Sequence, residues 1–156
     1  MLLISHRGNI KGPVEDEENK PPYIDAAIKE GYIVEIDLFA KGSDLWLGHD
    51  NPQYSVGLEW LKERNKSLLV HCKNLDVLTL MGGTNIPAFF HKTEDYALLT
   101  NGLIWAHTLT PVNDNCIIPL LTEEELLGFD PTTQAVAGIC SDYIDLINED
   151  RNNYNW

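Results

Sequence analysis

Short apolar runs alternate with helix-like segments from one end of the chain to the other. Seven runs have the length and composition of buried strands, and they cover residues 2–5, 32–39, 67–71, 88–91, 103–107, 116–120 and 136–140. Residues 45–47 form a shorter extended return. Helical patterns lie between the strands, over residues 23–30, 58–64, 93–99 and 142–148, and another helix starts at the capping box of Thr122 and Glu125.

Repeated β–α units of this kind predict a parallel sheet, either open or closed into a barrel. The closed eightfold barrel typically takes about 250 residues, whereas this chain has 156. A barrel of this length would therefore have vestigial helices or remain incomplete. The sequence contains no internal repeat and no convincing linker, so we expect a single domain over residues 1–156.

Polar side chains gather at the downstream ends of the predicted strands. Glu35 and Asp37 interrupt the second strand. The others end or follow an extended segment: His6, Arg7, His49, His71, Lys73, His91 and His107. In parallel α/β folds, this edge of the sheet is where ligand sites are built. The pattern therefore places all five histidines near one candidate site.

Glu35 and Asp37 are two residues apart in a strand, so both side chains lie on one face, as do those of His71 and Lys73. Two buried carboxylates repel each other and lose hydration unless positive charge lies between them. A divalent cation would satisfy them. Salt bridges to Arg7 and Lys73, or a strand with one face in solvent, would do so as well, and the pattern leaves these alternatives open.

This set of side chains fits the hydrolysis of a phosphodiester. The reaction requires a base for the attacking oxygen, an acid for the leaving alkoxide and positive charge at the phosphoryl oxygens. Two imidazoles can supply the acid and the base near neutral pH. A metal ion on Glu35 and Asp37, together with Arg7 and Lys73, would supply the positive charge.

Four short motifs follow one another within the first 50 residues: His6-Arg7-Gly8, Glu18-Asn19, Glu35-Ile36-Asp37 and His49-Asp50. Residues 136–143 add a final strand with a Ser141-Asp142 turn. This series resembles the HRG, E-N, E-x-D and H-D motifs of the glycerophosphodiester phosphodiesterase family, within the phospholipase-C-like phosphodiesterase barrel superfamily. The resemblance implies an α/β fold, namely a compact, shortened TIM-type (β/α) barrel with predominantly parallel strands and some vestigial helices.

The resemblance also implies three pairs of functional residues: catalytic His6 and His49, metal-binding Glu35 and Asp37, and phosphate-binding Arg7 and Lys73. The third strand of the family usually reads E-x-K, and its equivalent here is His71-Cys72-Lys73. His71 therefore takes the place of the third metal-binding carboxylate. We expect one divalent cation, Mg, Ca, Mn or Zn, and its identity stays open because histidine suits zinc or manganese better than calcium.

The implied activity is metal-assisted hydrolysis of a small, glycerophosphodiester-like phosphodiester, as in lipid metabolism. One alternative is a sphingomyelinase-D-like lyase that forms a cyclic phosphate. Another is a barrel that binds a phosphorylated ligand without turnover, for which the missing third carboxylate and the short chain are the motive.

Four further residues are candidates for the walls of the cleft: Glu18, His91, Trp105 and His107. The alternatives are backbone hydrogen bonds at the rim for the two histidines, a place in the core for Trp105 and a solvated acidic loop for Glu18. Asp50 either orients His49 or caps a turn. Asp142 is expected to cap the final helix rather than to contact substrate.

Composition narrows the partners and the compartment. The 24 acidic and 11 basic residues give a net charge of −13, which disfavours nucleic acid and an anionic membrane surface as partners. The three cysteines are far apart and lie in apolar runs, as buried thiols do. No run approaches the roughly 20 apolar residues of a membrane span, and the N-terminus lacks the pattern of a signal peptide. We therefore expect a cytoplasmic protein that acts on a small phosphodiester; the oligomeric state stays open.

Overall fold

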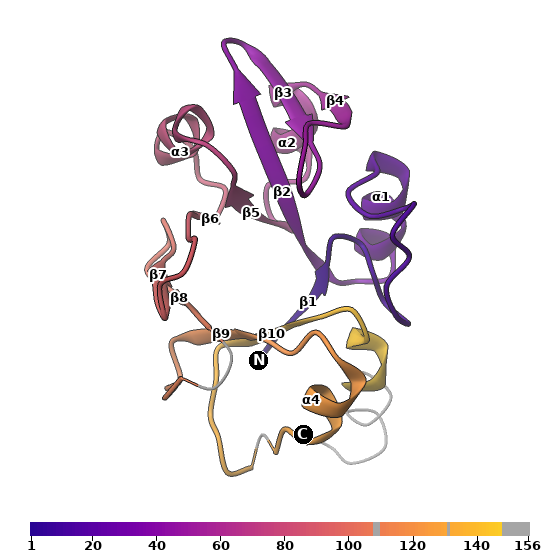
Figure 1. Ribbon diagram of the computed structural model, residues 1–156, viewed down its shortest axis with the longest axis vertical. Helices are drawn as coiled ribbons and strands as arrows, with labels where there is room; N and C mark the ends of the chain where they lie inside the picture. Colours follow the sequence, from indigo (N-terminus) through magenta and orange to yellow (C-terminus); the bar gives the residue numbers. More distant parts are fainter. Residues whose placement is uncertain (108–109, 131, 148–156) are drawn as a thin grey trace.

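The computed structural model describes residues 1–107, 110–130 and 132–147, which form a mixed α/β fold (Figure 1). Its ten strands belong to one sheet. The elements follow in the order β1 (Leu2–His6), α1 (Pro21–Lys29), β2 (Ile33–Lys41), β3 (Asp44–Leu47), β4 (Tyr54–Val56), α2 (Leu58–Glu63), β5 (Leu68–Cys72), α3 (Leu75–Gly82), β6 (Ala88–Phe89), β7 (Tyr96–Leu98), β8 (Ile104–Ala106), β9 (Cys116–Pro119), α4 (Glu123–Leu127) and β10 (Gly138–Ser141). In this part of the chain, no helix has the length and apolar character needed to cross a membrane.

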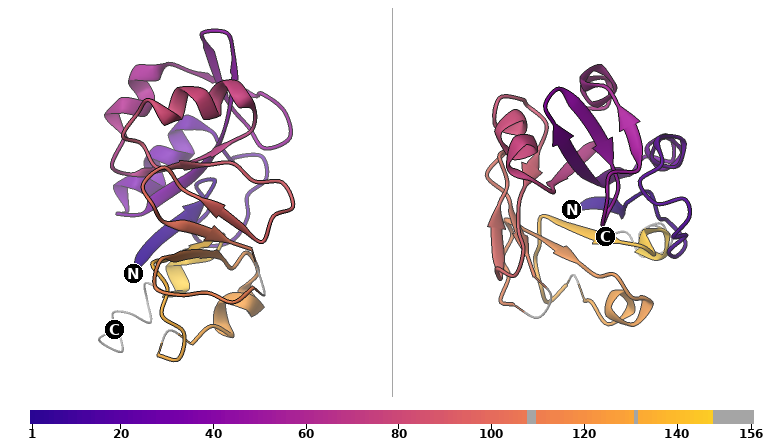
Figure 2. Two further views of the ribbon diagram at one scale, coloured as in Figure 1. Left: turned by 90° about the vertical axis from the view of Figure 1, so that its left-hand side faces the viewer. Right: turned by 45° about the horizontal axis from the view of Figure 1, so that its top comes forward.

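The expected TIM-type barrel is wrong. The sheet is a curled half-barrel whose main path runs β4-β3-β2-β1-β10-β9-β8-β7, with β5 paired to β2 and β6 paired to β5. Antiparallel pairing joins β2 to β3, β3 to β4 and β7 to β8, so the sheet contains both parallel and antiparallel strands. A TIM-type barrel would instead be a closed ring of parallel strands. Figure 2 shows this curl from two further directions, with the helices on its outer side.

The connections explain why the eightfold barrel does not form. In that barrel each strand is followed by a helix that crosses over to the next parallel strand. Here β2, β3 and β4 form a meander and β7 and β8 form a hairpin, while the described residues contain only four helices with defined bounds. Within those residues no ladder joins β6 to β7. Thr100 bridges the two parts instead, because its N–H donates to the carbonyl of Ala88 (2.9 Å) and its hydroxyl accepts from the N–H of Ala88 (3.0 Å).

Six parallel ladders nevertheless give the sheet one common downstream edge. They join β1 to β2 and β10, β10 to β9, β9 to β8, β2 to β5, and β5 to β6. Because the carboxyl ends of parallel strands meet at the same edge, the residues that end these strands come together there.

All seven strands expected from the apolar runs are present with shifted bounds, and the return at residues 45–47 is β3. The helix expected over residues 93–99 is wrong, because this segment contains β7, which pairs with β8. Helix α3 was not expected, although the Asn74 side chain caps it by accepting from the N–H of Val77 (3.2 Å). The capping box of Thr122 and Glu125 is confirmed at the start of α4.

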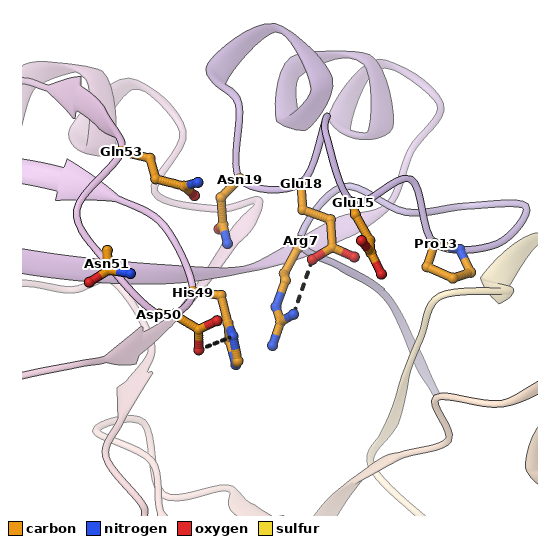
Figure 3. Close-up of a pocket in the computed structure, with 9 residues that line it drawn as sticks. All are labelled: Arg7, Pro13, Glu15, Glu18, Asn19, His49, Asp50, Asn51 and Gln53. Carbon is orange, nitrogen blue, oxygen red and sulfur yellow. Dashed lines mark hydrogen bonds and ion pairs between the residues drawn. The ribbon is translucent and has the colours of Figure 1, made fainter.

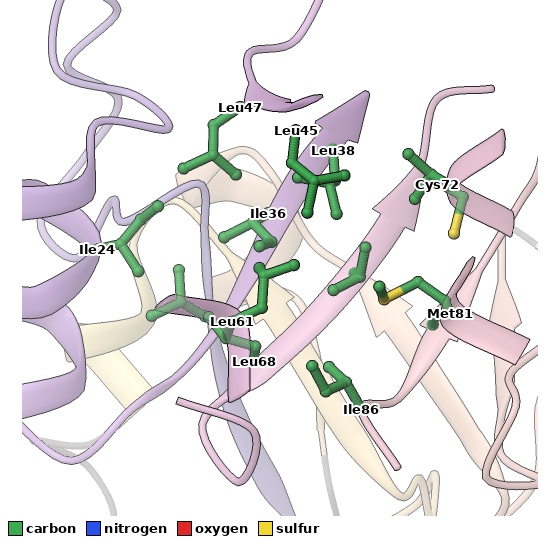
Figure 4. Close-up of a cluster of buried hydrophobic side chains, with 14 of the residues drawn as sticks. Ile24, Ile36, Leu38, Leu45, Leu47, Leu61, Leu68, Cys72, Met81 and Ile86 are labelled. Carbon is green, nitrogen blue, oxygen red and sulfur yellow. The ribbon is translucent and has the colours of Figure 1, made fainter. Parts of the chain in front are cut away.

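Strand β2 separates the largest apolar cluster from the inner face of the curl. Its residues Val34, Ile36 and Leu38 are fully buried in a cluster that includes Leu61 of α2 and Met81 of α3 (Figure 4). The intervening residues of a strand point to the opposite face. The apolar side of β2 therefore fixes the strand against the helices, and its other side carries Glu35 and Asp37.

Candidate active site

Strand register assembles the centre of the site from three neighbouring parallel strands. His6, the last residue of β1, pairs with Glu35 of β2, and Asp37 of β2 pairs with His71 of β5. Lys73 follows β5, and its N–H donates to the carbonyl of Leu38 at 2.9 Å. The sequence pattern had placed these polar residues at one edge, and the structure brings them together.

Asp37 is completely buried and surrounded by hydrogen-bond donors and cations. Its Oδ1 lies 3.1 Å from Nδ1 of His71 and 3.2 Å from Nζ of Lys73. Its Oδ2 accepts from the amide of Asn19 at 3.0 Å and lies 2.9 Å from Nε of Arg7, as an ion pair rather than an aligned hydrogen bond. Burial raises the pKa of Asp37, but the hydrogen bond to His71 and the charges of Arg7 and Lys73 outweigh it and hold the pKa well below its ordinary value. The salt-bridge alternative is thus present at Asp37.

Glu35 is also buried but lacks such partners. Within the described residues, its Oε2 accepts no hydrogen bond, and Nε2 of His6 lies 3.9 Å away. Its Oε1 lies 3.9 Å from Nδ1 of His71. Burial and the neighbouring charge of Asp37 raise the pKa of Glu35. An orphaned buried carboxylate oxygen is costly unless a cation or a donor meets it.

One donor atom from each of Glu35, Asp37 and His71 lies within 4.8 Å of the other two. This is the set expected to bind a metal, and two carboxylates with one imidazole suit a divalent cation. The oxygen of Glu35 that accepts no hydrogen bond from the described residues could contact such a cation. Asp37, by contrast, already has Arg7 and Lys73 as counter-ions. The donor set therefore fits a cation mainly through Glu35.

His6 is held from the side opposite Glu35. Its Nδ1 lies 2.8 Å from Oδ1 of Asp142, which follows β10, and its Nε2 faces Glu35. Burial lowers the pKa of His6, but the hydrogen bond to Asp142 and the charge of Glu35 outweigh burial and raise the pKa above 6.5. The same oxygen of Asp142 accepts from the amide of Asn9 at 2.7 Å.

His49 lies at the rim, in the loop after β3. The N–H of Gly48 donates to the carbonyl of Asp37 at 3.2 Å, which ties the loop to β2. Nδ1 of His49 lies 2.9 Å from Oδ1 of the exposed Asp50, so the orienting interpretation of Asp50 fits the geometry. Burial and the charges of Arg7 and Lys73 lower the pKa of His49, opposed by the carboxylates of Asp37 and Asp50. The two histidines thus have pKa values displaced in opposite directions.

His49 and Arg7 both line an open polar pocket of about 450 Å³. Figure 3 shows His49 and Arg7 pointing into the same opening, with Glu18 beside Arg7. The lining residues are Arg7, Pro13, Glu15, Glu18, Asn19, His49, Asp50, Asn51 and Gln53. The expectation that Glu18 lies at the cleft agrees with this arrangement. Its Oε2 accepts from Nη1 of Arg7 at 3.0 Å and its Oε1 from the amide of Asn9 at 2.9 Å.

The other candidate cleft residues lie outside this pocket. His91 and Trp105 belong to a row of stacked rings that extends from β5 to β8, with ring centroids 4.7 Å apart for His71 and His91 and 4.6 Å apart for Phe89 and Trp105. Trp105 is part of a buried apolar cluster. The exposed His107 follows β8, and its backbone N–H donates to the carbonyl of Asp95 at 2.7 Å.

Three polar residues of the site were not assigned a place in it from the sequence. Asn9 and Asn19 are completely buried, and Asn19 had entered only through the E-N motif. Asp142 was expected to cap a helix, but its side chain bonds to His6 and Asn9 instead. Its place directly after a buried strand, at the edge that collects the histidines, was a signal that could have identified it.

The comparisons give no family assignment. No protein-family model matches the chain, and neither a curated protein nor a solved structure matches it. The motifs and the geometry of the side chains are therefore the grounds on which a function can be argued.

Proposed function

We propose that the protein hydrolyses a small phosphodiester, with His6 as the general acid and His49 as the general base. One observation carries this proposal: the charge of Arg7 acts on both imidazoles, and their environments displace their pKa values in opposite directions from 6.5. Pairs of titratable groups whose environments separate their pKa values in this way mark acid–base assignments. A raised pKa favours the protonated form that an acid needs, and a lowered pKa favours the neutral form that a base needs.

The residues of the chain divide the reaction among them. Arg7, which lines the pocket, and Lys73, which contacts the same carboxylate of Asp37, hold the non-bridging phosphate oxygens. His49 takes a proton from the attacking water as the new O–P bond forms, and His6 gives its proton to the leaving oxygen as the old P–O bond breaks. The products are a phosphomonoester and an alcohol, and proton exchange with solvent restores both histidines.

The charges around the site favour a divalent cation as a cofactor. Four carboxylates belong to the ion pairs of the site: Glu18, Glu35, Asp37 and Asp142. Arg7 and Lys73 are the arginine and lysine side chains in these pairs. With His6 protonated as the acid, one negative charge remains in excess, which would repel a phosphodiester anion. Glu35, Asp37 and His71 would hold the cation, Mg, Ca, Mn or Zn. When bound, it neutralises charge at the phosphoryl oxygens.

A matrix of phosphodiesters and metal ions tests the proposal. Purified protein is assayed on an activated aryl diester and on glycerophosphocholine with calcium, magnesium, manganese or zinc, and with a chelator. We expect turnover that the chelator abolishes and that His6→Ala and His49→Ala each lower about 100-fold or more. His107→Ala is the matched control, because it removes an exposed histidine that lies outside the pocket.

The other outcomes each contradict a defined part of the proposal. Activity that survives the chelator excludes the cation. A cyclic phosphate that accumulates identifies attack by a neighbouring hydroxyl of the substrate, so the protein would be a lyase. Absence of turnover with every ion, together with phosphate-ligand binding that His6→Ala and His49→Ala leave intact, would identify a binding protein instead of an enzyme.

A further inference from the structure

The side-chain amide of Asn9 connects two carboxylates of the site, Asp142 and Glu18. Asn9 follows His6, Arg7 and Gly8 in a tight turn, in which its N–H donates to the carbonyl of His6 at 2.9 Å. Arg7 and Gly8 have φ values of 55° and 96°, so two successive residues in left-handed conformations reverse the chain. Gly8 is required there, because a Cβ atom would lie 2.6 Å from the ring of Tyr23. The turn thus buries the side chain of Asn9 next to His6 and Arg7.

Every hydrogen-bonding position of this amide is used. Its Nδ2 donates to Oδ1 of Asp142 at 2.7 Å and to Oε1 of Glu18 at 2.9 Å. Its Oδ1 accepts from the N–H of Val14 at 3.1 Å and from the hydroxyl of Tyr23 at 3.2 Å. An amide offers two donors and two acceptor sites, so Asn9 is fully satisfied. The opposite orientation would set its oxygen against two carboxylates, which fixes the amide in one arrangement.

The two carboxylates that Asn9 binds are those that hold the proposed acid and the proposed phosphate ligand. Asp142 contacts Nδ1 of His6 at 2.8 Å, and Glu18 contacts Nη1 of Arg7 at 3.0 Å. We propose that Asn9 is a positioning residue, whose buried amide fixes Asp142 against His6 and Glu18 against Arg7 and so sets these two side chains in one relative position. This inference rests on the proposed phosphodiesterase function.

The chemical consequence concerns which nitrogen of His6 reacts. A carboxylate accepts hydrogen bonds, so Asp142 requires a proton on Nδ1 of His6 and leaves Nε2 for the proton that is transferred. Asn9 donates to the same oxygen of Asp142. Without that donor, Asp142 and Glu18 lose the N–H groups that lie between their charges. The imidazole of His6 and the guanidinium of Arg7 are then no longer held in one relative position.

Two substrates with the same phosphoryl group but different leaving groups test the role of Asn9. An alkyl alcohol needs a proton to leave, whereas an activated aryl alcohol leaves without one. For Asn9→Ser we expect kcat to fall about 10- to 100-fold on the alkyl diester and less than about threefold on the aryl diester. KM should rise equally for the two substrates, because Arg7, which binds their common phosphoryl group, shifts. Tyr23→Phe is the matched control. It removes one bond to the same amide but keeps both N–H donors, and we expect both substrates to be turned over as in the unmodified protein.

Equal losses of kcat on the two substrates would overturn the inference, because they would indicate a general loss of structure. Unchanged kinetics would overturn it as well. If Asn9→Ser does not fold, as judged by circular dichroism, Asn9→Gln keeps an uncharged amide but displaces both N–H donors by one methylene group, and the same selective loss on the alkyl diester is expected.

A measurement without substrate separates this inference from the proposed function. Nitrogen-15 NMR at a pH where His6 is neutral reports which ring nitrogen carries the proton. We expect Nδ1–H in the unmodified protein and in Tyr23→Phe, and a mixture of tautomers in Asn9→Ser. Nε2–H in the unmodified protein overturns the inference even if the enzyme is active. Nδ1–H with no turnover of either diester sinks the proposed function and leaves the positioning by Asn9 and Asp142 in place.

Discussion

Asp37 and His71 lie in register on adjacent parallel strands, and Oδ1 of Asp37 is 3.1 Å from Nδ1 of His71. The imidazole of His71 therefore lies near both carboxylates of β2, Asp37 and Glu35. It bonds to a carboxylate that Lys73 also contacts at 3.2 Å, and it lies 3.9 Å from Glu35, whose other oxygen has no donor among the described residues. An imidazole in place of a carboxylate at this position keeps the local negative charge low, which affects the choice of cation.

Replacing His71 with a third carboxylate should change the cation preference. In His71→Glu an oxygen ligand with negative charge joins Glu35 and Asp37, and hard cations such as calcium and magnesium prefer oxygen ligands. We expect calcium to bind at least about tenfold more tightly, a change of about 1.4 kcal/mol, and zinc to bind more weakly. Titration calorimetry with each ion measures both effects.

The control for this change is His107→Glu, which adds the same charge at an exposed position directly after β8. It should leave the affinity for both ions unchanged. Equal calcium affinities of His71→Glu and the unmodified protein would show that His71 is not a ligand.

The polar centre could be predicted from the sequence because its causes are local. The spacing of Glu35 and Asp37 fixes their common face, and the apolar residues between them fix the strand. The end of a buried strand is visible as the residue where apolar character stops, as at His6 and His71. Because parallel strands share an edge, these local facts were enough to bring the side chains together.

The remainder depends on contacts between distant parts of the chain. The motif Thr93-Glu94-Asp95 is typical of a helix start, yet pairing with β8 makes the following residues a strand, so tertiary structure overrides local propensity. The closure of the barrel failed for a similar reason, since hairpins replace crossovers. Asp142 meets His6 across 136 positions of sequence, and only the parallel pairing of β1 with β10 brings them together.

Gly48 should be indispensable for the position of His49. Its φ is 147°, and a Cβ atom there would collide with the carbonyl oxygen of Asn51 in the same loop. Gly48→Ala should therefore cost more than the roughly 1–2 kcal/mol of an unfavourable positive φ alone, and should also lower activity by displacing His49. Gly31→Ala is the control, because Gly31 has a φ of 97° but open space around it. Urea unfolding and the diesterase assay compare the two, and equal stability losses would contradict the collision.

Arg64 should stabilise the fold more than other surface charges do. Its Nε and Nη2 contact the two oxygens of Asp25 at 2.6 and 2.9 Å, and its guanidinium lies 4.3 Å from the ring centre of Trp60. A bidentate pair combined with ring stacking should be worth about 1–2 kcal/mol. Lys62→Ala, which removes an exposed pair with Glu59 on the same helix, should change the free energy of unfolding by less than about 0.5 kcal/mol. Thermal unfolding of Arg64→Ala and Lys62→Ala measures the difference, and similar values for both would argue against the combined geometry.

The pH dependence of kcat/KM should be bell-shaped around neutrality. As the base, His49 must be neutral, so activity appears as pH rises through its pKa, which burial and the charge of Arg7 place below 6.5. As the acid, His6 must be protonated, so activity is lost as pH rises through its pKa, which Asp142 and Glu35 raise above 6.5 against the effect of burial. Asp50 raises the pKa of His49, so Asp50→Asn should move the acidic limb to lower pH and leave the basic limb in place. A shift of the basic limb instead would mean that the pKa of His49 lies above that of His6, which would contradict the order on which the assignment of acid and base rests.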